Sequence, residues 1–64
     1  MKVQIIDIHP RDAFYDNKKN LIGEFGILEM LGDETEAGFE GATIKFNDYL
    51  AAHYFYAVKF REVK

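Results

Sequence analysis

The residue types that usually carry enzyme chemistry are sparse in this sequence. It contains no Cys and no Ser, and its only imidazoles are those of His9 and His53. A nucleophilic triad needs a hydroxyl or thiol beside a base, and the only aliphatic hydroxyls are those of Thr35 and Thr43. General acid–base chemistry would rest on carboxylates, which are usually solvated at a surface. The sequence therefore predicts a protein that is not an enzyme, with no catalytic residues and no cofactor.

Two groups of side chains are candidate metal ligands. His9 and His53 would approach each other if the first and last strands paired, but they lack the close ligand spacing of a zinc site. The acidic segment 33–40 lacks the spacing of a calcium-binding loop. A solvated turn and surface histidines are the simpler interpretation, so we expect no metal site.

Aromatic side chains are more informative. Phe14 and Tyr15 interrupt the otherwise polar segment 11–20. Near the end of the chain, the alternating pattern predicts that the even-numbered residues 54–60 are buried, which leaves Phe55 on the open face. Exposed aromatic residues rimmed by charge mark interaction sites. The sequence thus predicts protein–protein binding through Phe14, Tyr15 and Phe55, with a second copy of the chain among the candidate partners.

An alternative function uses the same predicted strand. Phe55 would share its open face with Lys59 and Arg61. An aromatic residue beside basic residues on an open strand stacks nucleobases in several small barrels, so the alternative is single-stranded nucleic-acid binding. The formal net charge of −3 disfavours this alternative, because the ligand is a polyanion.

The hydrophobic pattern indicates an all-β fold. Residues 2–8 are rich in Val and Ile, and Pro10 ends that strand by restricting the residue before it. Gly23 and Gly26 lie where a barrel strand bends or bulges. The expected strands are 2–8, 21–31, two short strands within 39–46 and 53–63, connected by a loop at 11–20, an acidic turn at 32–38 and one helical turn at 47–52.

The length of the chain limits its organisation. Sixty-four residues enclose only one hydrophobic core, so a single domain, 1–64, is expected. No apolar stretch approaches the ~20 residues of a transmembrane helix, and Asp7 interrupts the first apolar run. Together with the absence of cysteine, these features predict a soluble cytoplasmic protein with no membrane partner.

The order of these elements resembles the SH3-like barrel, a small five-stranded fold with a short helical turn before its last strand. Residues 13–17, Ala-Phe-Tyr-Asp-Asn, resemble the Ala-Leu-Tyr-Asp-Tyr segment of eukaryotic SH3 domains. The chain has no Trp and its only proline is Pro10, so the resemblance does not extend to the groove that binds proline-rich peptides. The sequence is also similar to small uncharacterised SH3-like proteins of bacteria and phages. That resemblance implies the fold and no activity.

Overall fold

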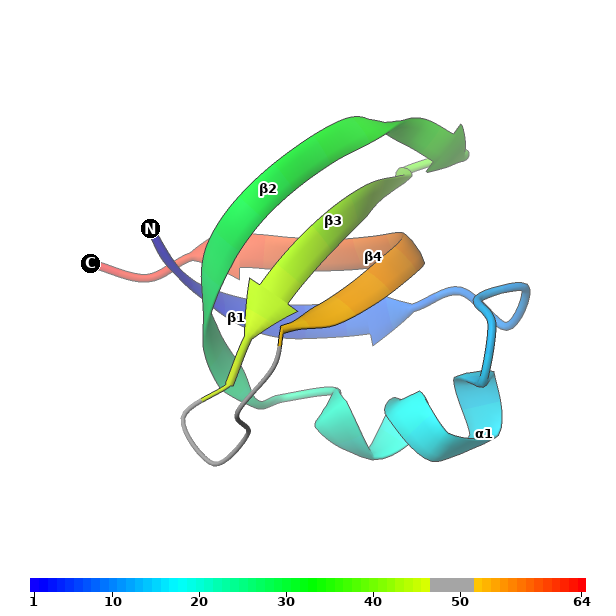
Figure 1. Cartoon of the computed structure of the whole chain (residues 1–64), viewed down its shortest axis with the longest axis horizontal. Coiled ribbons are helices and arrows are strands. Elements are labelled where there is room, and N and C mark those ends of the chain that lie inside the picture. Colours follow the sequence, from blue (N-terminus) through cyan, green and yellow to red (C-terminus); the bar gives the residue numbers. More distant parts are fainter. Residues whose placement is uncertain (47–51) are drawn as a thin grey trace.

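A computed structural model describes residues 1–46 and 52–64 of the chain. In this part the backbone forms a closed antiparallel sheet in the order β1-β2-β3-β4, with β4 paired back to β1. Figure 1 shows the long β2 curving around the sheet, with the short helices between the end of β1 and the start of β2. The elements are β1 (Lys2–Ile8), α1 (Tyr15–Lys18), η1 (Lys19–Leu21), β2 (Phe25–Glu36), β3 (Phe39–Lys45) and β4 (His53–Glu62).

The curvature of β2 allows the sheet to close. The start of the strand pairs with β1, where Gly26 lies opposite Val3, and the remainder pairs with β3. The pairing with β3 shifts register at three places, and such bulges bend a strand and increase its twist. Gly26 is required at the crossing, because a Cβ atom there would lie 2.7 Å from Ile44 Cγ2.

The core fills the inside of this sheet. In β1 the inward positions are Val3 and Ile5, and a register shift between Ile5 and Asp7 turns Ile8 inward as well. The buried apolar cluster is therefore drawn from three strands and the residue that follows β3. Its members are Val3, Ile5, Ile8, Ala42, Ile44, Phe46, Phe55 and Val58.

A bulge in β4 reverses the predicted faces in the first part of the last strand, although Val58 is buried as predicted. Ala42 pairs with Phe55, whereas Glu40 pairs with Val58, so two steps along β3 match three along β4. The inward-facing positions change from odd to even residue numbers at this irregularity, so Phe55 and Val58 are both fully buried. The prediction that Phe55 lies on an open face is wrong. Tyr54, which was predicted to be buried, is 61% exposed.

Three other predictions are corrected. The described residues contain four strands instead of five, because β3 runs unbroken from residue 39 to residue 45. The acidic segment 32–38 is mostly strand, since β2 continues to Glu36 and only the turn at Ala37 and Gly38 follows. The segment 11–20, predicted as a loop, contains α1 and the start of η1.

Two further expectations concern a helical turn and membrane insertion. The helical turn expected at 47–52 falls on residues 47–51, which lie outside the described residues. Among the residues that are described, no helix has the length and apolar character needed to span a bilayer.

Candidate functional site

The connection between β1 and β2 is fastened to the sheet by Asp12. Its side chain is buried, and its Oδ2 atom accepts a hydrogen bond of 3.0 Å from the backbone N–H of Ala57. Its Oδ1 atom accepts a hydrogen bond of 2.8 Å from Lys18 Nζ, which also donates to the carbonyl oxygen of Tyr54 at 2.6 Å. Buried charges are stable when paired and hydrogen-bonded in this way. The connection is therefore held to β4 at two points.

Local turns bring the two charged side chains together. The N–H of Asp12 donates to the carbonyl of His9, and the N–H of Tyr15 donates to the carbonyl of Asp12. These turns lead into α1, whose last residue is Lys18. The Lys18 ammonium lies 5.1 Å from the centroid of the Phe55 ring, a distance typical of a cation–π contact. Phe55 thus provides an apolar contact for the ammonium group of the ion pair.

Phe14 lies between these anchored residues and points into solvent. It precedes α1 with φ 61° and ψ 32°, the left-handed conformation, and its side chain is 76% exposed. It is the only non-glycine residue with a positive φ in the described part of the chain. This conformation costs an L-residue roughly 1–2 kcal/mol, and such outliers persist only where the surrounding structure enforces them. The anchored loop therefore holds a strained aromatic residue away from the core.

A shallow pocket lies beside Phe14. Its walls combine two apolar side chains, Phe14 and Leu21, with amide and cationic groups. Leu21 packs partly against the core, and the His53 ring makes an edge contact with Phe46 at 5.7 Å between centroids. An apolar surface with a few fixed polar groups suits recognition of a ligand or partner side chain. We call this the Phe14 surface, and its residues are Phe14, Asn17, Lys18, Asn20, Leu21 and His53.

The three residues predicted to bind a protein occupy different environments. Phe14 is exposed, Tyr15 is half-buried and packs against the core, and Phe55 belongs to the core itself. The structure therefore does not bring them together as one exposed patch. Asp12 and Lys18, which position the Phe14 surface, were missed because nothing in a polar segment distinguishes a buried ion pair from solvated charges.

The residues of the predicted nucleic-acid face also have different neighbours. Lys59 Nζ lies 4.9 Å from the centroid of the Phe39 ring, and Arg61 Nε donates a hydrogen bond to Gln4 Oε1 at 2.8 Å. Because Phe55 is buried, it does not share an open face of β4 with Lys59 and Arg61 as the alternation predicted.

The two histidines have different neighbours. His9 Nε2 lies 3.9 Å from Glu36 Oε1, and its ring meets Phe39 edge-on at 5.1 Å, whereas His53 packs against Phe46 and Phe55. Within residues 1–46 and 52–64, no three His, Cys, Asp or Glu side chains are grouped as a metal site would require.

Glu36 is the centre of a polar cluster on β2. Its Oε2 atom accepts a 3.0 Å hydrogen bond from the Tyr56 hydroxyl and lies 3.9 Å from Arg11 Nε. The hydrogen bond to Glu36, supported by partial burial and by the negative charge of Glu36, raises the pKa of Tyr56 above its ordinary value. A phenol held in its protonated form beside a carboxylate serves here to tie β4 to β2.

The described structure thus offers one anchored, strained aromatic residue beside a shallow pocket. The elements that position it are the Asp12 turn, α1 and the start of β4. Neither a protein-family model, nor a curated protein, nor a solved structure matches the chain.

Proposed function

We propose that this chain is a non-enzymatic binding module that recognises a protein partner through the Phe14 surface. The observation that carries the proposal is the conformation of Phe14, which is strained and largely exposed at once. A glycine or asparagine would adopt this backbone conformation at a lower cost. A phenyl ring at this position gains little from the fold, whereas it offers a partner a large apolar contact.

The anchoring of the loop supports the same proposal. Asp12 and Lys18 fix both ends of the turn that carries Phe14. A contact residue that is already ordered loses less conformational entropy on binding. The partner suited to this surface presents an apolar side chain to Phe14 and Leu21 and hydrogen-bonding groups to Asn17 and Asn20, and a second copy of the chain is one candidate.

We infer that the closed sheet is of the SH3-like class and that the protein works in the cytoplasm. The strongly bent β2, the long connection between β1 and β2, and the return of β4 to β1 support the architectural inference. The absence of cysteine supports a reducing compartment.

Affinity capture from the native cell tests the protein-binding proposal. We expect Phe14→Ala to lose the proteins that the unmodified chain retains. Tyr54→Ala, which removes another exposed aromatic ring, serves as the control and should retain them. Analytical sedimentation of both variants tests self-association: if the chain binds a second copy, Phe14→Ala should associate less than the control variant. Equal capture and equal association by the unmodified chain and Phe14→Ala would contradict the proposal.

A further inference from the structure

A second surface is formed where β1 lies between β2 and β4. In one cross-strand row Lys2 pairs with Ile27, which pairs with Lys45, and in the next row Arg61 pairs with Gln4, which pairs with Phe25. Residues directly opposite each other in an antiparallel sheet share a face, and none of these six is fully buried. We call them the Phe25 face, and its residues are Lys2, Gln4, Phe25, Ile27, Lys45 and Arg61.

This face is basic although the protein is acidic. Three of its six residues are cations and none is a carboxylate. Among the residues that the structure describes, no carboxylate lies within 4.0 Å of the charged nitrogens of Lys2, Lys45 or Arg61. Much of the negative charge lies elsewhere, on the β2–β3 hairpin, at Asp33, Glu34, Glu36 and Glu40. The net charge of −3 therefore conceals a local positive surface, which attracts polyanions.

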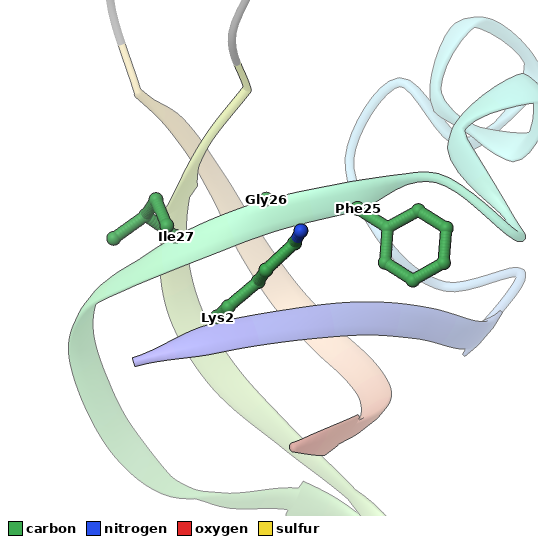
Figure 2. Close-up of a pocket in the computed structure, with 4 residues that line it drawn as sticks. All are labelled: Lys2, Phe25, Gly26 and Ile27. Atoms are coloured by element: carbon green, nitrogen blue, oxygen red, sulfur yellow. The ribbon is translucent and has the colours of Figure 1, made fainter. Parts of the chain in front are cut away.

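The apolar side chains of this face are accessible. Phe25 is 46% exposed and Ile27 is 42% exposed, and with Lys2 and Gly26 they line a shallow pocket. Figure 2 shows the Lys2 side chain extending from β1 toward β2, where its ammonium nitrogen lies 5.5 Å from the centroid of the Phe25 ring. Gly26 faces the core, where a Cβ atom would meet Ile44, so the side chains of Phe25 and Ile27 follow each other on the outer face of β2.

We propose that the Phe25 face binds single-stranded nucleic acid. A base stacks on the Phe25 ring and against Ile27, while the flanking phosphates lie near Lys2, Lys45 and Arg61. This combination of an aromatic platform with cations that follow a backbone is the general chemistry of such binding. A duplex is excluded from the stacking position, because its bases are already stacked on one another. The inference goes beyond the proposed protein contact, and the two surfaces share no residue.

A single introduced tryptophan tests the stacking contact directly. The natural chain has no Trp, so Phe25→Trp supplies a selective fluorophore at the proposed platform, and Phe14→Trp supplies a matched control at the Phe14 surface. We expect oligothymidine and oligouridine to quench the fluorescence of Phe25→Trp in a saturable manner and to leave that of Phe14→Trp unchanged. No quenching at low salt, or equal quenching of both variants, would overturn the proposal.

Affinity measurements by fluorescence anisotropy separate stacking from charge. Phe25→Leu retains apolar volume but removes the ring, and we expect it to weaken binding of a labelled oligonucleotide by about 5-fold or more. Lys45→Gln should weaken binding and reduce the salt dependence by about 0.7 in the logarithmic slope. Lys19→Gln makes the same charge change on η1, outside the face, and should leave both unchanged.

The same titrations distinguish this proposal from general attraction of anions. If duplex DNA binds as tightly as single strands and Phe25→Leu has no effect, the face is a nonspecific cationic surface and the proposal is wrong. Cooperative thermal unfolding of each variant confirms that the sheet is intact. Loss of protein capture by Phe14→Ala with unchanged oligonucleotide binding would support two separate sites.

Discussion

Lys18 Nζ and Asp12 Oδ1 lie 2.8 Å apart beneath the loop that carries Phe14, in an ion pair whose carboxylate is completely enclosed. The second carboxylate oxygen is hydrogen-bonded to the backbone of Ala57, and the ammonium is hydrogen-bonded to the backbone of Tyr54. The pair therefore satisfies backbone groups of β4 and orders the connection before β2. It links the stability of the sheet to the geometry of the proposed protein contact.

Breaking this pair should destabilise the whole domain. We expect Asp12→Ala to lower the free energy of unfolding by about 3–5 kcal/mol, because it leaves a largely buried ammonium without its counterion. The exposed pair of Lys19 and Asp16, 3.8 Å apart, is the control, and Asp16→Ala should cost less than about 1 kcal/mol. Urea denaturation measures both values. Similar small losses for the two variants would show that Asp12 does not anchor the loop.

Glycine should adopt the backbone conformation of residue 14 at a lower energetic cost than phenylalanine does. We expect Phe14→Gly to raise the free energy of unfolding by about 0.5–1 kcal/mol, since glycine adopts a positive φ without the steric cost of a Cβ atom. Phe14→Ala retains that cost and should not stabilise the protein. Thermal unfolding of the two variants side by side gives the comparison. A Phe14→Gly protein less stable than Phe14→Ala would mean that the backbone of Phe14 is not strained.

Because of the bulge in β4, we expect replacement of two adjacent aromatic residues to have very different effects on stability. Phe55→Ala removes a fully buried ring and should cost about 3–5 kcal/mol. Tyr54→Ala removes a side chain that is 61% exposed and should cost about 1 kcal/mol or less. Chemical denaturation distinguishes this arrangement from the simple alternation, which would give the reverse order.

The Tyr56–Glu36 hydrogen bond should weaken at alkaline pH. Its formation raises the pKa of Tyr56 in the folded protein, whereas the unfolded chain has the ordinary tyrosine value of about 10. The stabilisation is therefore complete below about pH 10 and is lost as the pH rises through the higher folded pKa. Ultraviolet titration of the phenolate should show Tyr56 ionising late. Glu36→Gln should lower its pKa, and an unchanged titration would contradict this assignment.

Much of the fold was predictable because it depends on short-range patterns. The Val and Ile residues before Pro10 and the apolar run that begins after residue 52 form β1 and β4, and the all-β class is confirmed. Of the two glycines expected at bends of a strand, Gly23 lies in the turn before β2, and Gly26 lies within β2, where a side chain would collide with Ile44. The count of five strands is wrong because Gly41 is accommodated within β3 without ending it.

The prediction of the binding site is wrong at the place where one extra residue in β4 changes the strand pairing. The extra residue in β4 moves Phe55 into the core, and no residue type near it marks the change. The Phe25 face was not predicted because it depends on register between strands, which brings Lys2 and Lys45 to opposite sides of Ile27. Sequence alternation indicates which residues share a face within one strand, but it does not indicate their neighbours across the sheet.

The two ends of the described fold emerge side by side, because the N–H of Val63 donates to the carbonyl of Lys2 at 2.8 Å (Figure 1). A short peptide would suffice to join them, and the cyclised backbone could then be opened at the Ala37–Gly38 turn without removing any strand pairing. We therefore expect the architecture to tolerate circular permutation, as well as insertion of the whole domain into a loop of another protein. The strands need not follow one another in their present order along the gene for the same sheet to close.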